Sequence, residues 1–183
     1  MLVRLAYAVL VGLVGAGLVH IAILLLLPGF SQRDAWSRLS MVSDLYRVVR
    51  LDTLTDGEPV IRSDDPLFHV GACRFDLTDG LVQISAESRV PYWSVSIYDR
   101  SGQNVYSFND RTAEGQILDF VVLTPAQMLE VRKEFPDEVG SSIFVESPIS
   151  EGILVVRGFV PDSSWEPTVS AFFSGMTCLP TRD

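Results

Sequence analysis

The sequence predicts an α+β protein, in which an N-terminal transmembrane helix precedes a mainly antiparallel β-sheet domain with two or three packed helices. Three observations predict it. An uncharged apolar run extends from Leu5 to Leu27. Beyond about residue 50 the hydrophobic period changes to two, which is typical of strands. The strands are separated mainly by tight turns, which favour antiparallel pairing over alternating βαβ units.

The apolar run is long enough to cross a bilayer. It holds 23 residues without a formal charge, and at about 1.5 Å per residue these span a hydrocarbon core of about 30 Å. A secretory signal has a shorter apolar region and a small-x-small cleavage site, whereas this run ends in Leu27-Pro28-Gly29. We therefore expect residues 1–4 to be a cytoplasmic tail and residues 5–27 to be a retained anchor.

The arginines that flank the anchor leave its orientation open. Arg4 precedes the run, and Arg33, Arg38, Arg47 and Arg50 follow it, so counting cations alone favours a cytoplasmic domain. The short N-terminal tail resembles that of a signal anchor, and the cysteine pair described below favours an oxidising compartment. We expect the domain to lie outside the cytoplasm.

The anchor also suggests two partners. The first is the lipid bilayer itself. The second is another copy of the chain, because Gly12 and Ala16 have the small-xxx-small spacing that lets two membrane helices approach closely. Glycine and alanine are common in membrane helices, however, so a homodimer through this helix stays an open alternative.

A separate amphipathic helix is expected over residues 28–50. Pro28-Gly29 should break the membrane helix. Apolar residues then recur at steps of three or four up to Val49, and this helix leads into a soluble domain over residues 51–183. It either packs on the sheet or lies among the lipid headgroups.

Alternating hydrophobicity and turn residues place the strands of the domain. We expect strands at residues 59–62, 67–77, 81–85, 92–98, 104–108, 116–123, 142–146 and 152–160. The pairs 67–77 with 81–85, 92–98 with 104–108, and 142–146 with 152–160 are predicted hairpins. The strand at 152–160 is almost continuously apolar and is therefore expected at the centre of the sheet.

Two further helices are predicted in the second half of the chain. Thr124, Pro125 and Gln127 form a capping-box pattern, and that helix should stop before Pro136. A last helix should begin near Asp162, since the apolar residues up to Met176 fall at helical spacing.

The chain holds two cysteines, Cys73 and Cys178, which are 105 positions apart. In an oxidising compartment a disulfide could hold the C-terminal tail to the sheet and contribute about 4 kcal/mol in the chain-entropy model. In the cytoplasm both would be buried thiols. An even count without a metal motif favours the bridge.

Residue types that carry metal binding or catalysis are scarce. His69 and Cys73 share a strand face, but His69 is the one histidine of the soluble part, and a structural zinc site needs more ligands. The sequence contains no nucleophile elbow, phosphate-cradling loop or dinucleotide fingerprint. The net charge of −9 argues against nucleic acid. We expect no catalytic residue, metal or cofactor.

The candidate ligand-binding residues are Tyr92, Tyr98, Asp99 and Arg100, at the second predicted hairpin. Aromatic side chains of this hairpin could line a groove for a ligand. Aromatic residues in hairpins more often pack across strands, so both interpretations stay open.

Four segments of the central region resemble a known family. They are Asp65–Phe68, Phe75–Leu77, Gly80–Ile84 and Pro91–Asp99, and they resemble the bacterial domain-of-unknown-function family 1254 in its short, membrane-anchored form. The resemblance implies a single-pass protein of the bacterial inner membrane with a periplasmic domain. It also implies a separate protein that supplies the second uncharacterised domain of larger relatives. It implies no catalytic residue.

Two functions agree with these observations. The first is a non-catalytic envelope module that binds a protein partner or stabilises an assembly. The alternative is an envelope enzyme or small-ligand binder that uses an aromatic-lined cleft beside Asp99 or Arg100.

Overall fold

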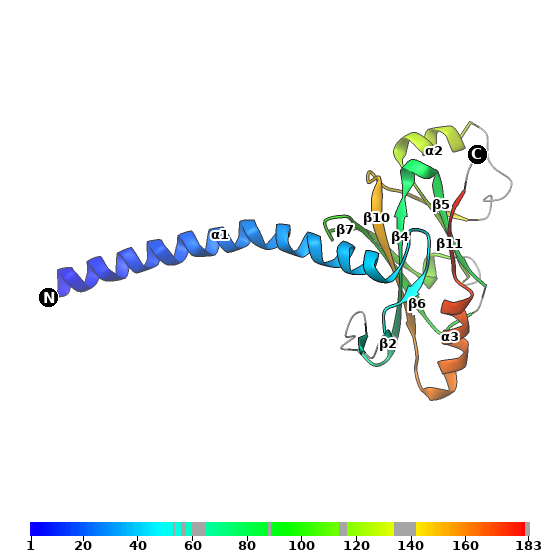
Figure 1. The fold of residues 1–183 in the computed structure, drawn as a ribbon, viewed down its shortest axis with the longest axis horizontal. Helices are drawn as coiled ribbons and strands as arrows, with labels where there is room; N and C mark the ends of the chain where they lie inside the picture. Colours follow the sequence, from blue (N-terminus) through cyan, green and yellow to red (C-terminus); the bar gives the residue numbers. More distant parts are fainter. Residues whose placement is uncertain are drawn as a thin grey trace.

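The computed structural model describes residues 1–52, 54–55, 58–59, 65–87, 89–113, 117–133 and 142–181. Within these ranges a long helix, α1 (Leu2–Val42), leads to a domain of β-sheets with two shorter helices, α2 (Pro125–Val131) and α3 (Glu166–Ser174) (Figure 1). The α+β class predicted from the sequence is confirmed. The strand predicted at 59–62 lies mostly outside the described residues.

Helix α1 differs from its prediction at two places. It continues past Pro28 and Gly29, so the predicted break and the separate helix over 28–50 are wrong. Proline costs a helix one hydrogen bond, but tertiary packing of the last turns can outweigh that cost. The helix then ends at Val42, since Val49 and Arg50 pair with a neighbouring strand and this pairing overrides the helical period.

The first part of α1 has the properties of a membrane span. Leu2–Leu26 has a mean hydropathy of 2.7 over its 18-residue window, and none of that window is buried inside the structure. By length and composition this segment fits a membrane anchor and a signal sequence alike.

Five strands form the larger sheet, in the order β1-β4-β10-β6-β7. Their bounds are β1 Val49–Arg50, β4 Phe68–Asp76, β10 Glu151–Phe159, β6 Trp93–Asp99 and β7 Asn104–Asn109. All neighbours are antiparallel, and β10 lies at the centre as predicted.

Four strands form the second sheet, in the order β11-β5-β8-β9. Their bounds are β11 Thr177–Thr181, β5 Leu81–Ala86, β8 Leu118–Leu123 and β9 Ile143–Glu146. Strands β8 and β9 are parallel and the other pairs antiparallel. Two short strands, β2 (Leu54–Thr55) and β3 (Glu58–Pro59), pair separately.

One of the three predicted hairpins forms. Strands β6 and β7 pair as expected, whereas β4 and β5, and likewise β9 and β10, belong to different sheets. The turn at Gly80, with φ 136°, therefore carries the chain from one sheet to the other. This turn and the β6–β7 turn each contain aspartate and end in glycine, so the turn residues do not distinguish a hairpin from a connection between sheets. The burial of two apolar strand faces between the sheets decides the outcome.

The main core lies between the two sheets. Trp93, Phe75 and Leu154 of the five-stranded sheet and Ile84 and Phe120 of the four-stranded sheet are almost completely buried there. Helix α3 closes one side of this core with its own buried apolar residues.

Glycines allow α3 to sit close to the sheet. A Cβ at Gly71 would lie 2.7 Å from the ring of Phe173, and a Cβ at Gly158 would lie 3.1 Å from it. Phe173 therefore packs where β4 and β10 carry no side chain. A side chain at Gly71 would overlap the ring, and one at Gly158 would make a tight contact with it.

The last turns of α1 cover part of the opposite, outer face of the five-stranded sheet (Figure 1). Leu39 is buried there with Ala72 and Ile153. Trp36 lies between two guanidinium groups, at 5.1 Å from that of Arg74 and 5.2 Å from that of Arg100. The end of α1 is therefore part of the domain.

The second half contains the predicted helices in shortened form. The capping box of Thr124 and Gln127 is present at the start of α2. The chain beyond it, at residues 134–141, lies outside the described residues. Asp162 caps a short 3-10 turn, Ser163–Trp165, which leads directly into α3.

Candidate functional site: a groove beside helix α3

A groove with a volume of about 660 Å³ lies between the segment after α1, helix α3 and strand β11. Its lining residues are Tyr46–Val48, Arg50, Ser170, Ala171, Phe173, Ser174 and Met176–Leu179. We refer to it as the α3 groove. Its walls come from three segments that are far apart in the sequence, and its lining mixes apolar side chains with hydroxyls and arginines.

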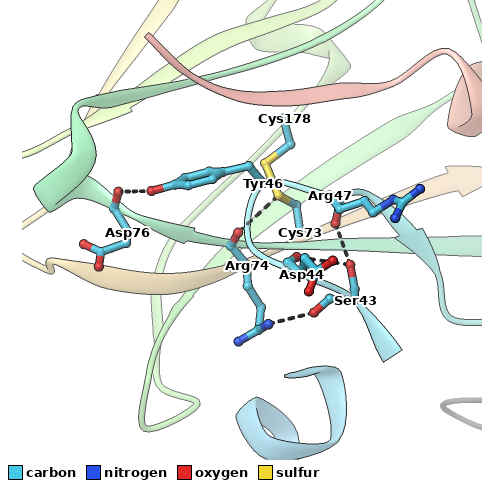
Figure 2. Close-up of a disulfide and its surroundings, with 8 residues drawn as sticks. All are labelled: Ser43, Asp44, Tyr46, Arg47, Cys73, Arg74, Asp76 and Cys178. Atoms are coloured by element: carbon cyan, nitrogen blue, oxygen red, sulfur yellow. Dashed lines mark hydrogen bonds between the residues drawn. A yellow bond between two sulfur atoms is a disulfide. The ribbon is translucent and has the colours of Figure 1, made fainter. Parts of the chain in front are cut away.

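Tyr46 fixes the wall that follows α1. Its backbone has φ 60°, and its hydroxyl lies 2.7 Å from the carbonyl oxygen of Asp76 (Figure 2). The same hydroxyl lies 2.7 Å from a carboxylate oxygen of Asp79. Burial, together with the hydrogen bond and negative charge of Asp79, raises the pKa of Tyr46 above its usual value. The phenol therefore stays neutral and serves as a fixed support.

A disulfide lies behind this wall. Cys73 of β4 and Cys178 of β11 are bonded, with Cα atoms 6.7 Å apart, and both residues are buried (Figure 2). The structure thus contains the bridged alternative of the two that the sequence left open. Because β4 and β11 belong to different sheets, the bond ties the two sheets together next to the groove.

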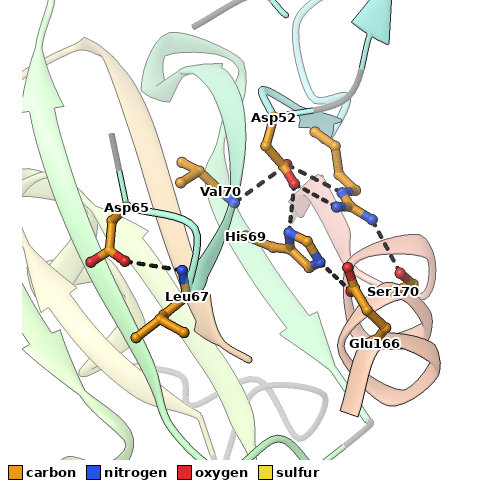
Figure 3. A network of polar contacts seen from close by, with 8 residues as sticks. Asp52, Asp65, Leu67, His69, Val70, Glu166 and Ser170 are labelled. Carbon is orange, nitrogen blue, oxygen red and sulfur yellow. Dashed lines mark hydrogen bonds and ion pairs between the residues drawn. The ribbon is translucent and has the colours of Figure 1, made fainter. Parts of the chain in front are cut away.

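A network of charged side chains adjoins the groove through Arg50. The Arg50 guanidinium lies 2.5 Å from a carboxylate oxygen of Asp52 and donates to the Ser170 hydroxyl at 3.2 Å. Asp52 also contacts His69 Nδ1 at 2.6 Å, and His69 Nε2 contacts the carboxylate of Glu166 on α3 (Figure 3). The network joins β1, β4 and α3.

Opposing effects act on Asp52. Burial raises the pKa of its carboxyl group, but the hydrogen bonds and positive charge of Arg50, aided by His69, outweigh it and hold the pKa below its usual value. His69 lies between two carboxylates, with Nδ1 at Asp52 and Nε2 at Glu166. The network is therefore a continuous series of polar contacts from Arg50 to α3.

The side chains of the network contact one another. The Ser170 hydroxyl contacts Arg50, His69 contacts Asp52 and Glu166, and Cys73 is in the disulfide. Among the described residues, no group of three or more His, Cys, Asp and Glu side chains is arranged to hold a metal ion.

Arg47 is the cation of the groove that is available to a ligand. Its side chain is exposed, its guanidinium points away from the neighbouring residues (Figure 2), and it has no ion pair within the described part of the chain. A smaller hollow of about 280 Å³ shares Arg47 and Val48 with the groove and extends to Ser40 on α1. The hollowed surface thus begins where α1 ends.

The four residues predicted to bind a ligand lie elsewhere. Tyr92 precedes β6 and Tyr98 is its next-to-last residue, which places them about 20 Å apart at the usual rise per strand residue. Tyr92 packs edge-on against Phe68. The structure therefore does not gather these residues into a single aromatic cleft, and none of them lines the α3 groove.

Asp99 and Arg100 have local partners in the β6–β7 turn. The Asp99 carboxylate accepts hydrogen bonds from the Ser101 hydroxyl and the Gln103 amide; burial raises its pKa, and these bonds lower it below the usual value. Arg100 pairs with Glu151 at 2.5 Å and stacks on Trp36. Both residues thus stabilise the turn and its contact with α1.

Sequence reasoning missed the groove residues Arg47, Arg50 and Ser170. The two arginines stand among apolar residues that recur at helical spacing up to Val49, which favoured a longer helix, and Ser170 carries no local signal. Their proximity depends on how α3 packs, which hydrophobic periodicity does not encode.

Residues 69–180 match the model of a family described as "Protein of unknown function (DUF1254)", and this match covers more than half of the chain. The chain belongs to the DUF1254 family. The resemblance inferred from the central motifs is confirmed. The DUF1254 match includes both cysteines and α3, whereas Arg47 and Arg50 precede it.

Two solved structures resemble this DUF1254 chain. The VPA0106 protein from Vibrio parahaemolyticus has 13% sequence identity and a TM-score of 0.56, over 83% of this chain and 35% of that chain. An uncharacterized protein from Burkholderia cenocepacia has 15% identity and a TM-score of 0.46, over 74% of this chain and 38% of that chain. The first shares the fold. No curated protein matches the sequence.

Proposed function

We propose that this DUF1254 chain is a non-catalytic, membrane-anchored binding module of the bacterial envelope, and that its α3 groove docks an extended segment of a protein partner. The observation that carries the proposal is the groove itself, an open hollow with an apolar floor and one exposed arginine, Arg47, at its edge. A segment with apolar side chains and an acidic residue matches that lining.

The anchor part of the proposal rests on α1. Leu39 and Trp36 belong to the packed domain, and the apolar run ends nine positions before Trp36, at Leu27. At about 1.5 Å per residue the helix would hold the domain roughly 14 Å from the hydrocarbon. The bilayer is thus the first proposed partner, and the inner membrane is the proposed location.

The periplasmic part of the proposal rests on the disulfide. Bonds such as Cys73–Cys178 persist in oxidising compartments and are rare in the cytoplasm. We therefore orient the N-terminus towards the cytoplasm and the domain towards the periplasm, against the simple count of arginines.

A protein partner is favoured by the solved neighbour of the same fold. The part of the VPA0106 chain that is covered amounts to 35% of its length, so in that protein the fold is accompanied by much more polypeptide. We propose that the fold acts here beside a further protein domain as well. A second copy of this chain, packed through Gly12 and Ala16, is the alternative partner.

A small-molecule ligand is the second candidate function. The volume of about 660 Å³ lies in the range of typical ligand pockets. The described lining residues of the groove include no imidazole or carboxylate, the groups that usually serve as general acid or base, so binding is favoured over catalysis.

Photo-crosslinking in intact membranes tests the docking site. A photoreactive residue at Leu179, a groove residue that is 57% exposed, should give one discrete adduct with another protein. Leu129 on α2 is 61% exposed and away from the groove, so the same residue there should give none. Equal adducts at both positions, or none at Leu179, would contradict the docking site. An adduct of twice the chain mass would indicate the homodimer.

A charge reversal provides a matched second test. Arg47→Glu should abolish the Leu179 adduct, because an acidic segment would then be repelled, whereas Arg111→Glu on the exposed turn after β7 should leave it unchanged. Both variants alter exposed arginines, so folding should be unaffected. An adduct that survives Arg47→Glu would show that Arg47 takes no part.

A topology reporter tests the orientation. A reporter that is active only outside the cytoplasm, fused after Asp183, should be active, and the protein should stay with membranes in high salt. An inactive reporter would overturn the periplasmic placement, and release by salt would overturn the anchor.

A further inference from the structure

A second polar site lies on the outer face of the five-stranded sheet, apart from the α3 groove. Arg157 of β10 pairs in register with Ser94 of β6, and Val155 pairs with Ser96, so these side chains share one face. On the next strand Ser107 lies opposite Ser96, and Asn104 lies opposite Tyr98. The face that α1 leaves uncovered here is therefore polar.

These side chains form one connected group of hydrogen-bonding atoms. The Ser107 hydroxyl lies 3.1 Å from that of Ser96 and 2.8 Å from the amide nitrogen of Asn104. The Arg157 guanidinium lies 3.5 Å from the Ser96 hydroxyl. Tyr98 lies opposite Asn104 on the same face, and Arg157, Asn104 and Ser96 are close enough to affect its pKa. The group spans three strands.

The charge of Arg157 is not neutralised within the described part of the chain. Its hydrogen-bond partner there is the uncharged hydroxyl of Ser96, and it has no ion pair with a described carboxylate, although the chain carries a net charge of −9. A guanidinium has more N–H donors than this partner uses. A half-buried cation in this setting favours an anion from solution.

These polar neighbours affect the pKa of Tyr98. Burial raises the pKa of Tyr98, but hydrogen bonds from Arg157, Asn104 and Ser96 outweigh it and lower the pKa below its usual value. The surroundings thus stabilise negative charge on an oxygen atom at this place. An anionic oxygen of a ligand would experience the same stabilisation.

We propose that Arg157, Tyr98, Ser96, Ser107 and Asn104 form a phosphate-binding site on the outer face of the sheet. The donors come from hydroxyl, amide and guanidinium groups on three strands and so suit a tetrahedral oxyanion with several acceptor oxygens. A planar carboxylate would use fewer of them. The site is independent of the α3 groove, since none of its residues lines that groove.

The phosphate group could belong to a lipid or to a soluble molecule. The site lies on the face from which α1 approaches (Figure 1), but Trp36 stands about 14 Å beyond the apolar run, and headgroup layers extend only about 5–8 Å from the hydrocarbon. A lipid would therefore reach the site only if α1 tilts, whereas a soluble phosphate needs no such tilt.

Equilibrium dialysis of the full chain in neutral detergent against radiolabelled inorganic phosphate tests the site. The wild-type chain should retain phosphate, and Arg157→Gln should weaken retention at least about tenfold, since a charge-assisted hydrogen bond is lost. Tyr98→Phe should weaken it about threefold. Arg111→Gln, an exposed arginine outside the site, should have no effect.

Three results would overturn the proposal. In the first, the wild-type chain retains no more phosphate than Arg157→Gln. In the second, Arg157→Gln and Arg111→Gln lose equal amounts of phosphate retention. In the third, acetate at equal concentration displaces the phosphate. If Arg157→Gln fails to fold by circular dichroism, the exposed Ser107→Ala variant decides, with a loss of about threefold expected and no loss contradicting the site.

An experiment in nanodiscs distinguishes a lipid phosphate from a soluble phosphate compound. In discs of neutral lipid, added anionic phospholipid should lower phosphate retention if lipid headgroups occupy the site, and Arg157→Gln should remove that competition. Retention that is independent of lipid charge assigns the site to a soluble phosphate compound. Competition by lipid and retention that is independent of lipid both involve the same residues, so either result supports the phosphate-binding site.

Discussion

The two faces of the five-stranded sheet are built by different means. The inner face carries Trp93, Phe75 and Leu154, which are almost fully buried against the second sheet, and it is crossed by the Cys73–Cys178 bond. The outer face holds a small apolar cluster around Leu39 and, beside it, polar side chains around Arg157. One face thus stabilises the domain, while the other connects it to α1 and leaves surface for ligands.

The two faces differ in the groups that shield their side chains from water. On the inner face, apolar area is removed from water against tightly packed rings, such as that of Phe108, which lies edge-on to Trp93 with ring centroids 5.9 Å apart. On the outer face, Trp36 is half-buried and is held largely by the guanidinium groups of Arg74 and Arg100. We therefore expect mutations on the inner face to cost more stability.

The largest effect is expected for Trp93→Ala on the inner face. Removing this fully buried ring should lower the free energy of unfolding by about 3–5 kcal/mol, because the cavity cannot collapse between two sheets. Urea unfolding in detergent, followed by near-UV circular dichroism, measures it. Trp165→Ala, at a residue that is 38% exposed, is the control and should cost less than about 1 kcal/mol. Equal losses of stability in Trp93→Ala and Trp165→Ala would contradict the expectation that the inner face stabilises the domain.

An intermediate effect is expected for Trp36→Ala on the outer face. The substitution removes two cation–π contacts and leaves the buried Arg74 with less cover, so we expect a loss of about 2 kcal/mol. The same urea experiment measures it, and the exposed Ser37→Ala variant on α1 is the control. A loss as large as that of Trp93→Ala would show that α1 belongs to the main core.

The smallest effect is expected at Asp52, in the network that joins α3 to β1 and β4. The native pKa of Asp52 lies below its unfolded value, so the native state binds fewer protons there. Its contribution is present above about pH 4 and is lost as the pH falls through the native pKa. Asp52→Asn should cost about 1 kcal/mol at pH 7 and flatten the decline of stability in acid.

The free energy of unfolding of the wild-type chain and of the Asp52→Asn variant, measured between pH 7 and pH 3, tests this expectation. Glu166→Gln is the comparison, since its carboxylate is 48% exposed on the other side of His69 and should contribute less. If Asp52→Asn retains the acid dependence of the wild type, other carboxyl groups are responsible for it.

Local patterns predicted local structure well. The alternation of Trp93, Val95 and Ile97 with polar residues indicated both a strand and its buried face, and the capping box at Thr124 marked the start of a helix. The central position of β10 followed from its apolar composition. In each case the signal depends on residues within about one element, which a sequence displays directly.

Contacts between elements were predicted poorly. The turn at Gly80 has the residues of a hairpin, yet it connects two sheets, because burial of both strand faces is a property of the whole domain. The same reason explains the groove, since Arg47 and Ser170 are 123 positions apart and meet only once Phe173 has packed on Gly71 and Gly158.

The sequence by itself therefore determined an apolar helix, the strands and helices of an α+β domain, a cysteine pair and membership of a family. Tertiary structure alone decided which strands share a sheet, that α1 continues into the domain, and where the groove and the Arg157 site lie. The physical reason is that hydrophobic periodicity specifies which face of an element is buried but does not name the surface that buries it.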